Sequence, residues 1–95
     1  MSKKEKISNW NDGDSGSFKD GTKFRLANVR APEKHQFGGS RATKVVSGMT
    51  SRSNGSVYVR IVGRDRYGRQ IVNMSNKDGS INQRMRSKGY VNKGR

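Results

Sequence analysis

The chain has 95 residues, 28% of them hydrophobic, and its 21 Lys and Arg residues against 7 Asp and Glu residues give a formal net charge of +14. This length allows one small domain, and so few apolar residues mean that nearly all of them must lie in its core. The sequence contains no cysteine, which excludes a disulfide framework and a thiolate metal site, and its single histidine excludes a histidine-based metal cluster. No stretch approaches the roughly 20 apolar residues of a membrane helix, and no apolar run follows the basic start, so we expect a cytoplasmic protein without a cleavable signal.

The first third of the chain predicts short strands joined by tight turns. Residues 1–6 are mostly basic and indicate a flexible arm. Residues 7–20 suggest two short strands around a polar, glycine-containing turn. Residues 22–29 alternate apolar and polar side chains, which predicts a half-buried strand that holds Arg25 outward.

The rest of the chain predicts a helix, two strands and a second helix. Four apolar residues at i, i+3, i+4 and i+7 predict a helix capped by Ser40 that buries Ala42, Val45, Val46 and Met49. Residues 56–62 alternate strictly, with Tyr58 and Arg60 on the polar face, and 71–74 form a fifth strand. Residues 81–85 begin a short helix that ends by Gly89.

The order of these elements matches a five-stranded OB-fold barrel, mainly β with α. One helix lies between strands 3 and 4, and another lies at the C-terminal end. We assign residues 7–95 to a single domain of this kind.

The net positive charge is larger in the second half of the chain, because that half holds fewer acidic groups. Residues 1–47 hold 10 basic and 5 acidic groups, whereas residues 48–95 hold 11 basic and 2 acidic groups. A field of this sign attracts polyanions, and nucleic acid is favoured over a membrane surface because no helix with a large apolar face accompanies the charge. The alternative is that these cations only keep a thin-cored domain in solution.

Three separated motifs carry candidate chemistry. The first is the Asp-Gly-Asp turn at 12–14, which is not an EF-hand because Lys23 occupies the twelfth position, where a glutamate is required. The second runs from Arg25 to Glu33. In the third, at 65–69, Tyr67 lies between arginines, and such a face suits a nucleobase beside phosphates. Taken singly, each motif fits a structural turn or a solvated loop equally well.

In this order the motifs resemble the staphylococcal nuclease (thermonuclease) family, over about residues 7–91. The matching pieces are the Asp12-Gly13-Asp14 turn, Phe24-Arg25-Leu26, Pro32-Glu33, Gln36-Phe37-Gly38, Asp65-Arg66-Tyr67-Gly68-Arg69, Ile81-Asn82 and Lys88-Gly89-Tyr90. The resemblance implies a nuclease of DNA, RNA or both that leaves 3′-phosphate ends.

The resemblance implies three catalytic residues. Arg25 and Arg69 match the two arginines that hold the scissile phosphate, and guanidinium groups pair bidentately with phosphate oxygens at any working pH. Glu33 matches the general base that activates the attacking water, and glutamate is ionised at neutral pH, as a base must be.

The metal site that the resemblance implies is altered in this chain. Asp14 matches a calcium ligand, with Asp12 and the Ala31 backbone carbonyl as further candidates. Where the family places a second metal-binding aspartate, this chain has Arg30, and a guanidinium repels a cation that needs six to eight oxygen ligands. We therefore expect calcium to bind weakly or not at all. Three outcomes follow: weak binding through Asp14 alone, a metal-free site in which Arg30 stabilises the transition state, or a site that only binds.

The remaining candidate residues are basic or aromatic. Tyr67 matches a nucleotide-contacting tyrosine and Asp65 a structural loop acid, and we assign further nucleic-acid contacts to Arg30, Arg64, Arg66, Arg84 and Lys88. The favoured interpretation is a monomeric nuclease that acts on DNA or RNA and does not bind membranes. The alternatives are an OB-like nucleic-acid-binding module that has lost catalysis, which Arg30 favours, and a basic protein that docks an acidic partner.

Overall fold

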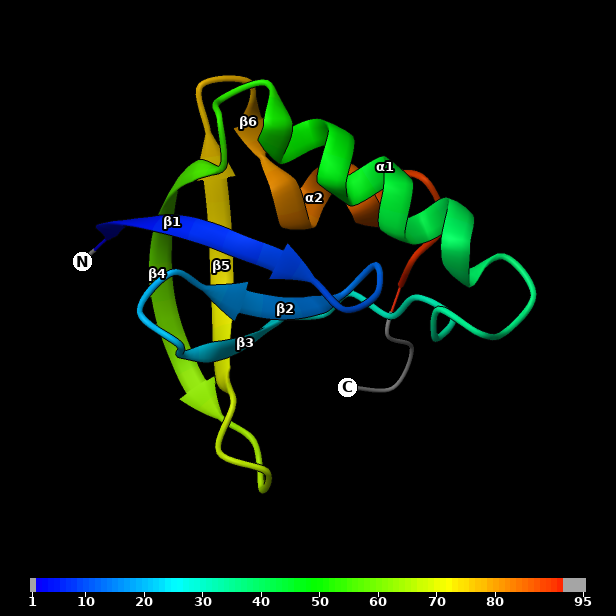
Figure 1. The fold of residues 1–95 in the computed structure, drawn as a ribbon, viewed down its shortest axis with the longest axis horizontal. Coiled ribbons are helices and arrows are strands. Elements are labelled where there is room, and N and C mark those ends of the chain that lie inside the picture. Colours follow the sequence, from blue (N-terminus) through cyan, green and yellow to red (C-terminus); the bar gives the residue numbers. More distant parts are fainter. Residues whose placement is uncertain (1, 92–95) are drawn as a thin grey trace.

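The structure, a computed structural model, describes residues 2–91. In chain order its elements are β1 (Lys3–Trp10), β2 (Ser15–Phe18), β3 (Lys23–Leu26), α1 (Gly39–Ser51), β4 (Ser56–Arg64), β5 (Gln70–Asn76), β6 (Gly79–Ser80) and α2 (Ile81–Ser87) (Figure 1). Residue 1 of the predicted arm and residues 92–95 of the predicted domain lie outside the described residues.

Five strands close into a mixed barrel in the order β3-β2-β1-β4-β5. Neighbours in this order pair antiparallel, and the parallel pairing of β3 with β5, in which Arg25 lies opposite Ile71, closes the ring. β6 adds only a two-residue hairpin to the end of β5. This mainly β fold, with α1 between β3 and β4 and α2 after the last strands, confirms the predicted OB-type barrel.

Strand β1 begins earlier than the sequence predicted. Lys3–Lys6, assigned to a flexible arm, pair antiparallel with β4, so that prediction is wrong for these four residues. Lys4 and Lys6 are exposed, while the neighbouring Glu5 lies 3.1 Å from the Lys3 ammonium group. Backbone pairing with β4 extends the strand here, and a pattern of apolar residues cannot reveal it.

The apolar faces of the strands meet inside the barrel, as their alternation predicts. Phe24 stacks on Phe18 with ring centroids 4.5 Å apart and meets the edge of Trp10 at 5.1 Å. Trp10 is a core residue, as expected for a chain with little apolar mass, and its indole N–H donates to the Thr50 hydroxyl of α1 at 3.1 Å. Burying the ring is acceptable because this hydrogen bond satisfies its polar group.

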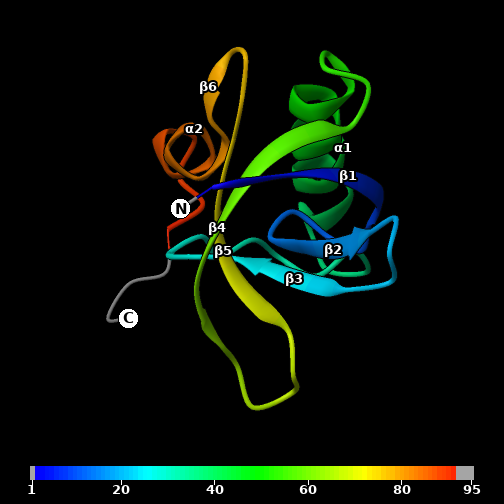
Figure 2. The ribbon, with the colours of Figure 1, turned by 90° about the vertical axis from the view of Figure 1, so that its left-hand side faces the viewer.

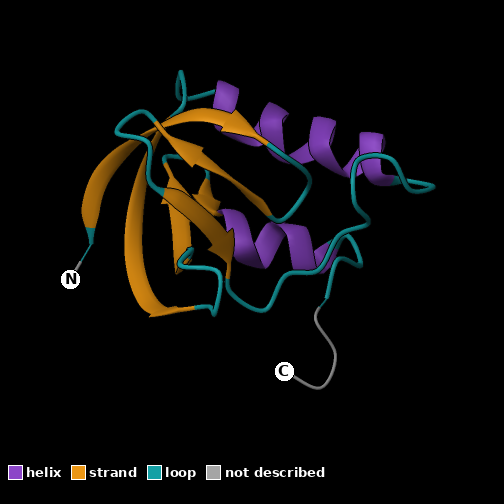
Figure 3. Cartoon of the chain, turned by 60° about the horizontal axis from the view of Figure 1, so that its bottom comes forward, coloured by secondary structure: helices purple, strands orange, loops and turns teal. Residues whose placement is uncertain are grey.

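Both helices pack against the barrel from one side (Figure 3). α1 buries Ala42, Val46 and Met49 and packs Val45 at the edge of the core, which confirms the predicted stripe. Within residues 2–91, no helix combines the length and apolar character that a bilayer crossing requires.

The start of α1 corrects the prediction of Ser40 as the N-cap. The cap is Gly38, whose φ of 82° is left-handed, and no side chain bonds to the helix end. The next position, Gly39, requires glycine because a Cβ there would overlap the backbone carbonyl of Glu33. The close return of the loop onto Glu33 therefore sets the helix start, and capping preference does not.

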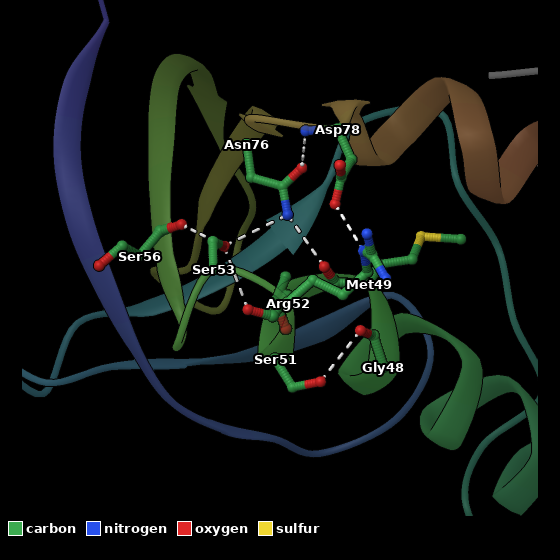
Figure 4. Close-up of polar contacts among 9 residues, drawn as sticks. Gly48, Met49, Ser51, Arg52, Ser53, Ser56, Asn76 and Asp78 are labelled. Atoms are coloured by element: carbon green, nitrogen blue, oxygen red, sulfur yellow. Dashed lines mark hydrogen bonds and ion pairs between the residues drawn. The ribbon is translucent and has the colours of Figure 1, made fainter.

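A polar cluster fastens the end of α1 to the turn between β5 and β6 (Figure 4). The buried Asn76 amide donates to the Met49 carbonyl at 2.9 Å, and its oxygen accepts the Asp78 N–H at 3.0 Å. At the surface, Arg52 pairs with Asp78 at 2.8 Å. These contacts fix the C-terminal end of α1, whereas the loop at Glu33 fixes its N-terminal end.

Candidate functional site

A cleft of about 1040 Å³ opens on the outside of the barrel where β3 runs beside β5. Its walls come from the turn after β1, from the end of β3 and the loop that follows it, and from the β4–β5 hairpin. Its charged lining residues are Asp12, Asp14, Arg25, Arg30, Glu33 and Arg69. The cleft thus brings together the three predicted catalytic residues and, with Ala31, all of the predicted metal-site candidates.

Gly13 allows the acidic turn to lie against the opposite wall. A Cβ at Gly13 would come within 2.7 Å of the Ala31 Cβ and 2.8 Å of the Ala42 Cβ on α1. Real Cβ atoms do not approach this closely, so a larger residue would push the turn away. The glycine therefore positions Asp12 and Asp14 in the cleft.

Asp65 holds Arg69 in place at the start of β5. Its carboxylate accepts the Arg69 Nε–H at 2.6 Å and also the backbone N–H groups of Tyr67 and Arg69, each at 2.9 Å. Exposure of the Arg69 side chain is 30%, so part of the guanidinium group remains available to the cleft. Desolvation opposes ionisation of Asp65, but the hydrogen bonds from Arg69 and Tyr67 prevail and lower its pKa. Asp65 has the structural role that the resemblance implied.

The loop that carries Glu33 is braced by Gln36. The Gln36 side-chain oxygen accepts the Glu33 N–H at 2.9 Å, and the Gln36 N–H donates to the Glu33 carbonyl at 2.8 Å. These two bonds set the backbone at Glu33 while its side chain stays exposed beside the cleft. The carboxylate can therefore meet a substrate without local unfolding.

Asp12 and Asp14 form a hydrogen-bonded acidic pair on one wall of the cleft. Asp14 is 8% exposed as a residue, and its carboxylate accepts the Ala31 N–H at 3.1 Å. Burial, together with the hydrogen bond to Asp12, raises the pKa of Asp14 to about 7, against the opposing charge of Arg25. Burial also disfavours ionised Asp12, but hydrogen bonds from Asp14 and Ser15 outweigh this and lower its pKa. Between the lowered pKa of Asp12 and a pH of about 7, the pair therefore holds one proton, on Asp14.

These residues do not fit a calcium site. Calcium takes six to eight oxygen ligands, whereas residues 2–91 contain no group of three or more His, Cys, Asp or Glu side chains placed to hold a metal. Ala31 meets Asp14 through its N–H group, and Arg30 borders the same cleft with a positive charge. Both features disfavour a divalent cation, because the Ala31 N–H uses an acceptor site of Asp14 and the Arg30 charge repels a cation.

The other predicted nucleic-acid contacts lie outside the cleft lining. Tyr67 is 72% exposed in the β4–β5 turn, with the Arg66 and Arg69 guanidinium groups 5.5 and 5.7 Å from its ring centroid. Arg64 ends β4 and is exposed. On α2, Arg84 is partly buried, with one guanidinium nitrogen that lacks a partner among the described residues, and Lys88 caps the helix end. Tyr67 is linked to the cleft indirectly, through Arg69, which lines the cleft and contacts the Tyr67 ring.

Sequence reasoning missed part of the lining. Val62 and Ile71 form an apolar patch of the cleft, and Val62 is 51% exposed. Val62 lies on the same outward face of β4 as Tyr58 and Arg60, in line with the alternation of residues 56–62. That alternation gives the side of the strand but does not show that this face borders a cleft. Gln36 also lines the cleft, and the resemblance included it in the Gln36-Phe37-Gly38 piece without giving it a role in the site.

Comparison with protein-family models identifies a family for the chain. A family model described as staphylococcal nuclease homologue matches residues 23–93. The match includes Arg25, Glu33 and Arg69, whereas Asp12 and Asp14 precede it. No curated protein matches the chain closely enough to show a relationship.

Proposed function

The chain belongs to the staphylococcal nuclease homologue family, and we propose that it is a small nuclease that hydrolyses phosphodiester bonds of DNA, RNA or both. Membership indicates a nuclease or nucleic-acid-binding function. The observation that carries the finer proposal is the convergence of Arg25, Glu33 and Arg69 on one cleft from three separate parts of the chain.

The proposed roles follow from the chemistry of these side chains. Arg25 and Arg69 bind the phosphate oxygens and stabilise the charge that builds on them as water attacks phosphorus. Glu33 accepts the proton of that water. The 5′-oxygen then leaves, and a 3′-phosphate end remains, as the resemblance implies. Positioning and charge account for most of the catalysis of phosphoryl transfer, and these three residues supply both.

No step of this proposal passes through calcium. Since Arg30 adds a third guanidinium to the cleft, it supports binding of the phosphate in the absence of a metal. We expect cleavage to persist when divalent cations are chelated.

The second candidate is a nucleic-acid-binding module without catalysis, and Arg30 is the observation that favours it. An additional arginine can hold the phosphate in an orientation in which Glu33 cannot reach the attacking water. This candidate predicts salt-sensitive binding of nucleic acid with no strand scission.

The test is cleavage of labelled single- and double-stranded DNA and RNA, with added calcium and with a chelator. We expect Arg25→Ala and Arg69→Ala each to lower the cleavage rate by about 100-fold or more. The matched control is Arg41→Ala, which removes an exposed arginine from α1, outside the cleft, and should cleave as the original protein does. Binding without cleavage of any substrate would establish the second candidate, and equal rates for the two cleft variants and the control would refute the proposed roles.

A further inference from the structure

The outer surface of the barrel carries an exposed aromatic ring between cations. Tyr58 is 51% exposed and lies opposite Lys4 of β1 and Ser75 of β5. Arg60, the next outward residue of β4, lies opposite Asn73. We call these outward side chains of Lys4, Tyr58, Arg60 and Asn73 the β4 face. Figure 2 views β4 and β5 from their side of the barrel, where they run from the level of the helices to the hairpin turn below.

Core packing does not explain the position of Tyr58. The adjacent residues of β4, Val57 and Val59, are fully buried and supply its inward face. In a chain with 28% hydrophobic residues, an aromatic ring left half in solvent is surface that the fold does not use.

The β4 face continues into the cleft. Beyond Arg60 and Asn73, the next residues toward the hairpin are Val62 and Ile71, which line the cleft, and Ile71 lies opposite Arg25. At about 3.3 Å per residue, Tyr58 lies about 13 Å along β4 from Val62. A strand whose phosphate lies at Arg25 can therefore leave the cleft over Ile71 and pass Arg60 before it reaches Tyr58.

The charges of the β4 face favour a polyanion. Lys4 and Arg60 are both exposed on either side of the Tyr58 ring. The nearest acid of β1, Glu5, points to the other side of the sheet and is paired with Lys3 at 3.1 Å. An aromatic face between cations is the arrangement on which unpaired bases stack while the phosphates follow the positive charge.

We propose that the β4 face is a second binding surface, on which a single strand of DNA or RNA that leaves the cleft stacks one base on Tyr58. The inference rests on the proposed function and extends it from a phosphate site to a substrate class, the single-stranded nucleic acid. A duplex keeps its bases stacked on one another and cannot use the ring in this way.

The test compares two labelled oligothymidylates by fluorescence anisotropy, in a Glu33→Gln background that prevents cleavage. One has about 12 nucleotides, enough to cover cleft and face, and the other about three, which fill the cleft alone. We expect Tyr58→Ala to weaken binding of the longer strand by about 10-fold and to leave the shorter one unchanged. Tyr58→Phe keeps the ring and should bind as the background protein does.

The charge contribution is tested through salt dependence. Arg60→Ala should reduce the slope of log K against log salt for the longer strand by about 0.7, the loss of one phosphate contact on a single strand. Lys44→Ala, an exposed cation of α1, is the matched control and should leave the slope unchanged. Melting temperatures of all variants show whether they fold.

The outcomes separate this inference from the proposed function. If Tyr58→Ala binds the longer strand as tightly as the background protein does, the inference about the β4 face is wrong and the proposed role of the cleft is not affected. A similar loss for both lengths would mean that the substitution disturbs the cleft, and it would also overturn the inference. Tyr58-dependent binding of the longer strand, insensitive to Arg25→Ala and without cleavage by the original protein, would support the face and refute the cleft as the catalytic site.

Discussion

Arg30 is the position at which this chain departs most from the pattern of its family. It stands where the resemblance places a metal-binding aspartate, and it borders the cleft beside Arg25 and Asp14. We expect titration calorimetry to detect calcium binding to Arg30→Asp and not to the original protein, because the change replaces a repelling charge with an oxygen ligand.

Arg30→Gln serves as the control for this calcium prediction. It removes the positive charge without adding a carboxylate, so it should bind calcium more weakly than Arg30→Asp does. If the original protein binds calcium as tightly as Arg30→Asp does, Arg30 points away from the site and the metal-free account is wrong.

Asp14 makes stability depend on pH. Its pKa is about 7 in the folded protein against an ordinary value of 3.8, so the folded state holds a proton that the unfolded state has lost between these values. Stability is therefore highest at low pH within this window and falls as pH rises. We expect the free energy of unfolding to fall by about 2 to 3 kcal/mol from pH 5 to pH 8.

Asp14→Asn is the matched variant for this pH dependence. The amide is neutral at every pH and can still donate to Asp12, so the variant should lose most of the fall between pH 5 and pH 8. Urea unfolding at the two pH values measures the difference, and an equal fall in both proteins would assign the effect to another group.

At the scale of elements, Asn82 joins α2 to β5 and to Ala27, the residue that follows β3. It is 1% exposed; its amide donates to the Ala27 and Val72 carbonyls, each at 3.0 Å, and its oxygen accepts the Met74 N–H at 2.8 Å. Asn82→Ala removes three buried hydrogen bonds, although the Val72 carbonyl still accepts the Ala27 N–H and the Ala27 carbonyl still accepts the Arg86 guanidinium. We therefore expect the substitution to cost about 2 to 3 kcal/mol in urea unfolding.

Gln83→Ala is the control for Asn82. The Gln83 side chain is exposed on the same helix, and its loss should change stability by less than about 0.5 kcal/mol. If the two variants are equally stable, α2 does not depend on the Asn82 hydrogen bonds.

The elements themselves could largely be predicted from the sequence, because alternation and the helical stripe report burial directly. Phe24 and Leu26 are inside, as is the stripe of α1, while Tyr58 and Arg60 are outside. The alternation of residues 22–29 also places Ala27 on the outward face with Arg25, and this is wrong. Ala27 is 8% exposed because β3 ends at Leu26 and the Ala27 N–H donates to the Val72 carbonyl.

The convergence of the cleft residues could not be predicted from periodicity. Arg25 and Arg69 are 44 positions apart in the printed sequence, and the parallel β3–β5 pairing that brings their strands together has no local signal. Resemblance in the order of motifs was the only guide to the set. The cap at Gly38 and the place of Val62 in the cleft lining depend on contacts made after the fold closes, and the sequence pattern missed both.

At the scale of the whole molecule, a net charge of +14 on 95 residues produces a positive field that draws in polyanions. If the cleft and the β4 face together contact about four phosphates, log K for a single strand should fall against log salt with a slope of about −3. Anisotropy titrations between low and moderate salt measure the slope. A slope near zero would show that the excess charge takes no part in binding.

The most direct test of the central claim is the rate at which Glu33→Gln cleaves a labelled single-stranded oligonucleotide, measured in chelator beside the original protein. We expect the original protein to cleave it and Glu33→Gln to be at least about 100-fold slower, with binding unchanged, since the substitution removes the general base and keeps the arginines. Cleavage by Glu33→Gln at the original rate would contradict the account, as would an original protein that binds the strand and never cuts it.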